Sequence, residues 1–430
     1  MGPMSSYLEQ IKSWPRDTRL FLFYNLFAFV GWGVFQLIFN LYCVELGYRE
    51  NDLGVFQAAQ TVAMAIAAVA MGPVIRRSGA WGSMVGAIAI FTVSSFFMAW
   101  AENFWLLAAL SALSGVGLAY LFNSIMPYII EWTPREHRAN VAAIVFAVTS
   151  LSGTVGSLVG GYLPDTMPIS DLWSYRWTLV IGTLIAGVGI IPLLLMRDTR
   201  GENPVPEVGA QREAESKQER RQVRTDVAVF VAIGGIMALG AGMVIPFYNV
   251  YLPDLGARSG TIGLVFAVGG FASAIFGLAA PMVQRRFGAI PAVATIRLAG
   301  LPLFAMLIFL PALPIAIAAH IVRQITINRG WPIDSTFIAD VLPPSKRASV
   351  YGLRSASWNL LWALASLIGG FVIVRFGYAI PFATLVITGL VAIVLFVVYY
   401  GRHPRVRSGD LPSALPRGRS IANRARQEAA

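Results

Sequence analysis

Apolar stretches about as long as a membrane helix recur along the whole chain, and short polar breaks separate them. About 20 mainly apolar residues are needed to cross the hydrocarbon core of a bilayer as a helix. The breaks carry charged and helix-ending residues, as at 76–79 and 343–345. The pattern predicts an all-α membrane protein with twelve transmembrane helices, near 20–44, 52–74, 81–100, 103–131, 138–163, 174–196, 225–252, 260–283, 289–309, 312–341, 348–374 and 378–400.

Composition supports the membrane assignment and excludes several other classes. Hydrophobic residues make up 56% of the chain and charged residues 13%, whereas soluble domains carry about 25% charged residues. A disordered chain and an ordinary soluble enzyme are excluded on this ground. The formal net charge of +11 could suggest a nucleic-acid partner, but the distribution of the charges gives another explanation.

Lysine and arginine gather on one side of the predicted spans. If both termini are cytoplasmic, 25 of the 33 basic residues lie on that side, four lie outside and four lie within spans. Such an imbalance is the positive-inside signal of membrane proteins. We therefore expect a multi-pass protein of the plasma (inner) membrane with both termini cytoplasmic, an uncleaved first span and no nucleic-acid partner.

The polar segments divide the chain into parts. A polar segment at 197–224 separates six spans from six spans, and the residues after Gly401 are basic and rich in Pro and Ser. We expect a cytoplasmic N-terminus (1–19), an N-terminal six-helix half (20–196), a cytoplasmic linker (197–224), a C-terminal six-helix half (225–400) and a cytoplasmic basic tail (401–430).

The two halves repeat at a constant offset of 209 residues. Asn40 corresponds to Asn249, Arg76-Arg77 to Arg285-Arg286, and Glu131 to Asp340, without a gap. Chance similarity between apolar segments would scatter the offsets. Parallel repeats of this kind are typical of transporters, in which the substrate binds between the repeats and each side is exposed in turn.

Twelve spans, a long linker after the sixth, and a paired basic loop after spans two and eight resemble the major facilitator superfamily. The resemblance covers essentially the whole chain. The loop that corresponds to the family motif G-x-x-x-D-R-x-G-R reads GPVIRRSGA at 72–80, so Arg76 replaces the acidic residue and Ala80 the final basic one. The family's acidic lock is therefore absent. We expect a gating role on the cytoplasmic face for Arg76, Arg77, Arg285, Arg286, Glu131 and Asp340.

The resemblance implies that spans 1, 4, 7 and 10 line a central cavity. Span 1 carries Asn25, Trp32, Gln36 and Asn40 at spacings that place them on one helical face. We expect this stripe to bind substrate, with hydrogen bonding between helices as the alternative. In span 10 we expect Arg323, Gln324, Arg329 and Trp331 to bind substrate, and Asp334 and His320 to couple protons.

Four arginines lie within predicted spans, all of them in the second half. They are Arg297, Arg323, Arg329 and Arg354, whereas Asp334 is the one deeply embedded acid. A charged side chain at the bilayer centre costs about 2.5–3.5 kcal/mol on insertion scales, so an anionic ligand would balance the excess charge. For Arg297 and Arg354 we favour a structural role, by snorkelling or by pairing with Asp340.

These features predict a secondary transporter that moves a small organic anion by alternating access. One alternative is an exporter of lipophilic compounds, favoured by Trp32, Trp331, Trp358 and Trp362 and by small residues at 152–161. A second is a membrane receptor or scaffold without transport. No phosphate-binding loop, catalytic dyad or metal cluster is evident, so we expect neither enzyme activity nor a cofactor or metal. The expected partners are a small-molecule substrate, the lipid bilayer and protons, and the expected state is a monomer.

Overall fold

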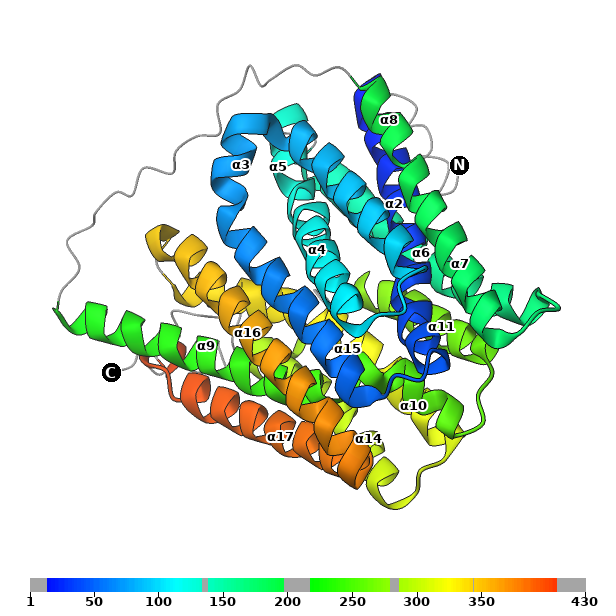
Figure 1. The fold of residues 1–430 in the computed structure, drawn as a ribbon. Helices are drawn as coiled ribbons and strands as arrows, with labels where there is room; N and C mark the ends of the chain where they lie inside the picture. The colour runs from blue at the N-terminus through cyan, green and yellow to red at the C-terminus, as the bar shows by residue number, and fades with distance from the viewer. Residues whose placement is uncertain (1–13, 134–137, 197–216, 279–285, 343, 408–430) are drawn as a thin grey trace, which may run out of the picture. The chain divides into compact units, whose positions relative to one another are not determined.

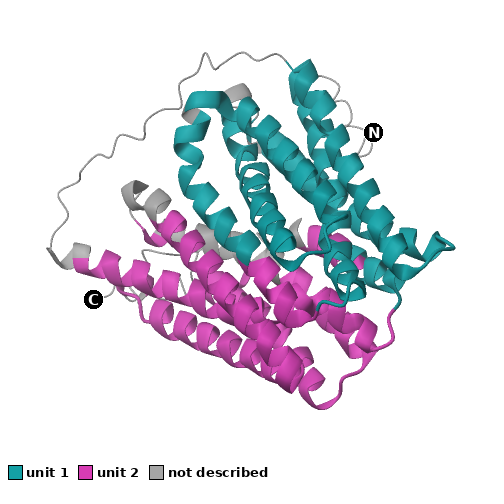
Figure 2. Cartoon of the chain, viewed as in Figure 1, with its two compact units in different colours: residues 1–48, 59–206, 258–267 teal, residues 49–58, 207–257, 268–430 magenta. Residues whose placement is uncertain are grey.

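The computed structural model describes residues 14–133, 138–196, 217–278, 286–342 and 344–407, which form helices joined by turns. Side chains are described for most of these residues but not for 76, 131–132, 139, 217–220, 327–340 or 344–349. The chain divides into two compact units (Figure 2). Unit 1 comprises residues 1–48, 59–206 and 258–267, and unit 2 comprises 49–58, 207–257 and 268–430.

Unit 1 is a bundle built around its first helix (Figure 1). Helix α2 packs most extensively against α6 and α7. Small residues allow this approach, because a Cβ added to Gly33 would lie 2.5 Å from the Gly153 carbonyl oxygen. The helices that supply unit 1 are α2 (Arg16–Glu45), α3 (Glu50–Met98), α4 (Phe104–Asn123), α5 (Ile125–Trp132), α6 (Arg138–Thr166), α7 (Asp171–Val188) and α8 (Ile190–Leu195).

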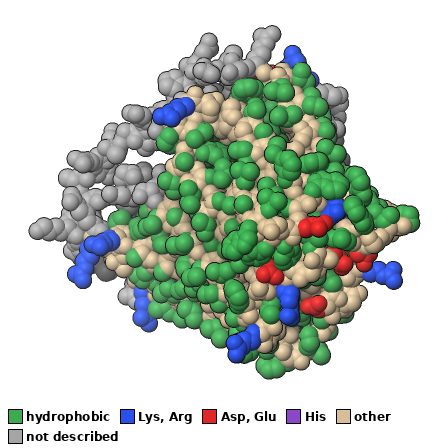
Figure 3. All heavy atoms as spheres, viewed as in Figure 1, with side chains coloured by type: hydrophobic (Ala, Val, Ile, Leu, Met, Phe, Trp, Pro, Cys, Tyr) green, Lys and Arg blue, Asp and Glu red, His purple; other side chains and the backbone are tan. Residues whose placement is uncertain are grey.

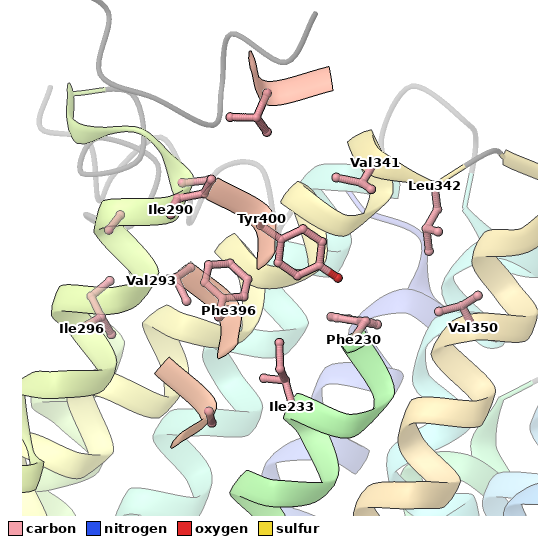
Figure 4. Close-up of a cluster of buried hydrophobic side chains, with 14 residues drawn as sticks. Phe230, Ile233, Ile290, Val293, Ile296, Val341, Leu342, Val350, Phe396 and Tyr400 are labelled. Carbon is pink, nitrogen blue, oxygen red and sulfur yellow. The ribbon is translucent and has the colours of Figure 1, made fainter. Parts of the chain in front are cut away.

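Unit 2 is a second helical bundle, in which α9 packs against α16 and α17. A core of buried apolar side chains joins these helices to α13 and to the end of α15 (Figure 4). Phe230, Phe396 and Tyr400 are its large members. The elements of unit 2 are α9 (Lys217–Val244), η1 (Ile245–Phe247), α10 (Tyr248–Asp254), α11 (Ser259–Leu278), α13 (Ala289–Ala299), α14 (Leu301–Phe309), α15 (Leu313–Val341), α16 (Pro344–Phe376), α17 (Ala379–Gly401) and α18 (Pro404–Arg407).

The helices agree with the predicted membrane spans. Among the described residues, eleven helical segments are long and apolar enough to cross a membrane. The remaining expected span, 312–341, corresponds to α15, of which Leu313–Thr326 is a shorter apolar helix. Hydrophobic side chains also cover most of the face seen in Figure 3. The all-α membrane fold is thereby confirmed.

The sequence repeat reappears in the backbone. Gly47 and Gly256, 209 residues apart, have φ values of 92° and 89°, and Gly79 and Gly288 have values of 71° and 81°. Positive φ is accessible to glycine and unfavourable for other residues. Each repeat therefore makes the same two sharp turns, one before and one after its second span.

Each unit includes the beginning of a helix whose remainder belongs to the other unit. In unit 2, a Cβ added to Gly54 would lie 2.6 Å from the carbonyl oxygen of Ser366. In unit 1, a Cβ added to Gly263 would lie 2.6 Å from the carbonyl oxygen of Ser157. The 209-residue offset relates these two close contacts to each other. The first residues of α3 and of α11, which we call the exchanged helix starts, are therefore held by equivalent glycine contacts.

Candidate functional site

Unit 2 contains a pocket with a cavity volume of about 130 Å³. Side chains from α9, α13, α14, α15, α16 and α17 contribute to its wall, and all of them belong to unit 2. Three of them are arginines, one each from α13, α15 and α16. The described residues that line it are Met237, Ala241, Ile245, Arg297, Gly300, Leu301, Phe304, Arg323, Thr326, Arg354, Trp358, Leu385, Thr388 and Gly389.

Two of the arginines lie deep in the membrane-spanning part of the unit. At 1.5 Å per residue, Arg297 lies about 12 Å from the start of α13, and Arg323 about 15 Å from the start of α15. The span containing α13 and the following helix α15 enter from opposite sides, because one short turn joins them. With a hydrocarbon core about 30 Å thick, both guanidinium groups therefore lie near mid-membrane.

Aromatic rings hold two of the arginines in place. The guanidinium carbon of Arg354 lies 4.2 Å from the ring centroid of Phe230, and that of Arg297 lies 5.1 Å from the centroid of Phe396. Arg354 is 3% exposed, and its stem runs over Gly234, where an added Cβ would lie 3.2 Å from Nε. Stacking on an aromatic face stabilises a buried cation. The hydrophobic core thus fixes the positions of both guanidinium groups.

Arg323 is held differently. Its Nη2 donates a hydrogen bond of 3.2 Å to Oε1 of the neighbouring Gln324. Its Nε is buried and has no hydrogen-bond partner among the described residues. Guanidinium groups present a planar set of donors that matches carboxylate geometry. Arg323 therefore keeps one buried donor that no described residue satisfies.

Apolar groups and two hydroxyl groups complete the wall. Phe304, Leu301 and Trp358 contribute hydrophobic surface. Thr326 Oγ1 donates to the Arg323 carbonyl oxygen at 2.8 Å, and Thr388 Oγ1 donates to the Thr384 carbonyl oxygen at 2.7 Å. Both hydroxyl oxygens keep lone pairs available as acceptors. None of the described residues that line the pocket carries a carboxylate.

The other residues expected on α15 have separate positions. His320 is completely buried, and its ring lies 5.5 Å from that of Tyr248 and against Gly269 rather than in the pocket wall. The backbone carbonyl of Gln324 accepts a hydrogen bond from Ser273 Oγ at 2.9 Å, which ties α11 to α15. The side chains of Arg329, Trp331 and Asp334 lie outside the described residues.

The predicted polar stripe on α2 is not uniform. Asn25 is fully buried, and its Nδ2 donates to the Phe21 carbonyl oxygen at 2.7 Å within the same helix. Trp32 is half-buried, and its ring meets that of Phe122 edge-on at 5.3 Å. Gln36 is exposed and Asn40 half-buried. Asn25 thus bonds locally, whereas the other three leave part of their surface accessible in unit 1.

Of the residues expected to gate the cytoplasmic face, the structure describes two. The side chains of Arg77 and Arg286 are exposed, and the guanidinium carbon of Arg286 lies 5.5 Å from the Phe287 ring centroid. They precede the equivalent glycine turns at Gly79 and Gly288. The remaining four, Arg76, Arg285, Glu131 and Asp340, have side chains outside the described residues.

Sequence reasoning favoured a structural role for Arg297 and Arg354, which stays a prediction; that both also line the pocket was not anticipated. A signal was present, since the equivalent residues in the first half are Ile88 and Val145. It also missed a buried cluster at the start of α9, where the Asp226 carboxylate lies 3.3 Å from His403 Nε2. In the part of the chain that is described, no group of three or more metal-ligating side chains occurs.

In the turn before α17, Tyr378 donates a hydrogen bond of 3.2 Å to the Glu50 carboxylate. Desolvation of the phenol, together with the neighbouring negative charge of Glu50, raises the pKa of Tyr378 well above its ordinary value. The phenol therefore remains a donor throughout the physiological pH range and holds the start of α3 within unit 2.

Comparison with known proteins gives consistent similarities. The family model described as Major Facilitator Superfamily matches residues 21–327 and 233–426. A 4-hydroxybenzoate transporter of Pseudomonas putida is 27% identical over 54% of this chain and 58% of its own length. A chloramphenicol efflux pump of Mycobacterium tuberculosis is 27% identical over 51% of each chain. The matches thus span little more than half of these relatives.

Solved structures share the fold at low sequence identity. The crystal structure of the nucleoside transporter NupG superimposes with a TM-score of 0.70 and 14% identity, covering 90% of this chain and 98% of that one. At this identity the similarity concerns the arrangement of the helices.

Proposed function

Because the chain belongs to the Major Facilitator Superfamily, we propose that it is a secondary transporter that moves a small organic anion across a membrane by alternating access. The observation that carries the proposal is the convergence of Arg297, Arg323 and Arg354 on one pocket. Guanidinium groups near mid-membrane, such as those of Arg297 and Arg323, cost several kcal/mol to bury. A negatively charged ligand would recover part of this free energy.

The similarity to a 4-hydroxybenzoate transporter supports the same class of substrate. An aromatic carboxylate combines one negative charge with an apolar body, as the pocket wall requires. We therefore take benzoate and 4-hydroxybenzoate as the first compounds to test.

Transport is tested with purified protein reconstituted into lipid vesicles. Vesicles loaded with unlabelled 4-hydroxybenzoate should accumulate the labelled compound by counterflow, and protein-free vesicles should not. A panel of sugars and lipophilic cations provides the specificity control. If no carboxylate in the panel shows counterflow although the protein is folded, anion transport is rejected.

Export of lipophilic compounds is the second candidate function, favoured by the similarity to a chloramphenicol efflux pump and by Trp358 in the pocket wall. The two functions predict different responses to charge. Arg329→Glu should abolish carboxylate counterflow if the substrate is an anion. Unchanged carboxylate counterflow in Arg329→Glu would contradict the expected role of this residue. Chloramphenicol counterflow without carboxylate counterflow in the wild-type protein would favour the exporter. A membrane receptor or scaffold would show neither.

Proton coupling is proposed for Asp334 and His320. Substrate binding at Arg329 would displace Asp334, and the loss of a positive neighbour raises the proton affinity of a carboxylate. Asp334→Asn should then preserve substrate binding but remove the pH dependence of transport. A pH profile of uptake that matches the wild-type profile would exclude Asp334 as the coupling residue.

We further propose that the chain is a monomer of the plasma (inner) membrane with cytoplasmic termini, and that the basic pairs at 76–77 and 285–286 set the balance between its two open states. Neutralising both pairs should change the transport rate more than the equilibrium affinity for substrate. A normal rate in both paired variants would limit these residues to setting topology.

A further inference from the structure

We propose that one end of unit 2 carries a binding surface for the headgroups of anionic phospholipids, which we call the arginine rim. The rim consists of three exposed side chains, Arg221 at the start of α9, Arg402 just after α17, and Arg405 in α18. None of the three lines the pocket described above, so the inference goes beyond the proposed transport of a solute.

A cluster of polar side chains beneath the rim brings two helix ends together. Gln222 Nε2, near the start of α9, donates to the hydroxyl oxygen of Tyr399 at 3.3 Å. His403 Nε2 lies 3.3 Å from the buried carboxylate of Asp226. Two arginines of the rim directly precede Gln222 and His403 in the chain. The start of α9 and the end of α17 are therefore in contact, and their arginines share one end of the unit.

Helix α18 holds the third arginine at the same end. Val406 is 2% exposed and belongs to the apolar cluster that joins α9, α17, the start of α13 and the end of α15 (Figure 4). Nη1 of Arg405 donates to the carbonyl oxygen of Val341, the last residue of α15, at 3.0 Å. Groups that are ordered before a ligand arrives lose less conformational entropy on binding. The rim is thus organised in advance.

The rim lies where the helices leave the hydrocarbon core. The apolar span that contains α9 begins at Arg221, and the span of α17 ends at Gly401. Exposed apolar side chains, such as Val394 and Val398, precede this end of α17. Arginine side chains at such a boundary keep their charged groups among the headgroups, while apolar side chains contact the acyl chains. The position of the rim therefore favours a lipid over a soluble partner.

The charge at this end determines the sign of the headgroup. Within the segments that adjoin it, 217–226, 285–286, 340–347 and 402–407, basic residues outnumber acidic ones eleven to three. One of the three acids is Asp226, which is buried and already accepts a hydrogen bond. Guanidinium groups form strong, often bidentate hydrogen bonds to phosphate oxygens. A headgroup whose phosphate lacks a compensating amine, such as phosphatidylglycerol, therefore fits better than a zwitterionic one.

The measurement is the thermal unfolding midpoint of the purified full-length protein in detergent, with increasing amounts of dioleoyl phosphatidylglycerol or dioleoyl phosphatidylcholine. A ligand that binds the folded state raises the midpoint by mass action. Phosphatidylglycerol should raise the midpoint more than phosphatidylcholine does at the same mole fraction. The difference should shrink between about 50 and about 500 mM salt, because exposed charges are screened.

The rim variant combines Arg221→Gln with Arg402→Gln and should lose most of the stabilisation by phosphatidylglycerol. Each basic residue beside an anionic surface strengthens the association about fivefold. Each single variant should therefore raise the phosphatidylglycerol content required for half of the effect by about that factor. Arg405 is left unchanged because it also binds the end of α15.

Arg258→Gln combined with Arg375→Gln is the matched control. Both side chains are exposed, one before α11 and the other near the end of α16. They lie on the opposite side of the predicted spans, and the control variant loses the same charge as the rim variant. It should keep the full stabilisation by phosphatidylglycerol.

The midpoint without lipid shows whether each variant folds, and exposed substitutions of this kind usually change stability little. The single variants keep the test valid if the rim variant does not fold. Equal stabilisation by the two lipids, undiminished stabilisation of the rim variant, or an equal loss in the control variant would overturn the rim. Soluble glycerol 3-phosphate should not raise the midpoint. If it matched phosphatidylglycerol, the rim would bind free phosphate esters and the lipid surface would be rejected.

Discussion

Asp226 is a buried carboxylate on which several parts of unit 2 depend. Its Oδ1 accepts hydrogen bonds from the Tyr399 hydroxyl at 2.6 Å and from Gln222 Nε2 at 3.0 Å. His403 Nε2 lies 3.3 Å from the same carboxylate, and the side chains of His403 and Asp226 are 2% and 3% exposed. Asp226→Ala should therefore destabilise the protein, because three polar groups lose their common partner.

The magnitude follows from burial and from the number of partners. Each hydrogen bond to a charged group contributes about 1.5–3 kcal/mol, and a buried polar group left without its partner costs about 1–3 kcal/mol. These contributions overlap because the groups form one network. We expect a loss of about 3–5 kcal/mol for Asp226→Ala. Asp226→Asn keeps one oxygen acceptor and should lose about 1–3 kcal/mol.

The assay is thermal unfolding of purified protein in detergent, followed by far-ultraviolet circular dichroism. The melting temperature should fall in the order wild type, Asp226→Asn, Asp226→Ala. Arg224→Gln, an exposed change two residues away on the same helix, should melt as wild type does. A double variant with His403→Ala should be less destabilised than the sum of the single variants, since each removes the same interaction. Wild-type melting of Asp226→Ala would refute the reasoning.

Three further predictions concern other parts of the molecule. Glu102→Gln should destabilise unit 1 by about 1–2 kcal/mol, because the Arg176 side chain is only 6% exposed and pairs with Glu102 at 2.6 Å. Chemical denaturation measures the change. An unchanged free energy of unfolding would show that Tyr42 and the nearby aromatic rings stabilise the buried Arg176 without Glu102. Gly161→Val should lower the yield of folded protein in size-exclusion chromatography, since a Cβ at this position would lie 2.5 Å from Gly263 Cα. A normal yield would show that α6 and α11 can move apart without loss of stability. A cysteine introduced at Ser408 should not react with an impermeant thiol reagent added to intact cells. The native Cys43 is buried and should not react either. Efficient labelling would place the C-terminal tail outside the cell.

The fold could be predicted because its determinants are local. Apolar stretches are long enough to identify each span, and the 209-residue offset locates Gly79 and Gly288 at equivalent loops before their φ values are known. Arg323 could be named as a candidate for the same reason, since a charge in an apolar stretch is evident without knowledge of its neighbours.

The pocket could not be predicted, because it depends on how helices pack. Arg297 and Arg354 are separated from Arg323 by at least 26 residues, and the direction of each side chain is set by Phe396 and Phe230 beneath them. Asp226 and His403 are 177 residues apart. Their pairing requires that α17 return to the start of α9, which no local pattern encodes.

The exchanged starts of α3 and α11 make the two repeats interdependent in the manner of a domain swap within one chain. Residues 49–58 are encoded in the first repeat but pack in unit 2, where a Cβ on Gly370 would clash with the carbonyl oxygen of Glu50. Residues 258–267 are encoded in the second repeat but pack in unit 1. Cutting the chain between residues 197 and 216 would therefore give two fragments that each lack a packing segment, so that neither should fold alone as well as the two do when coexpressed.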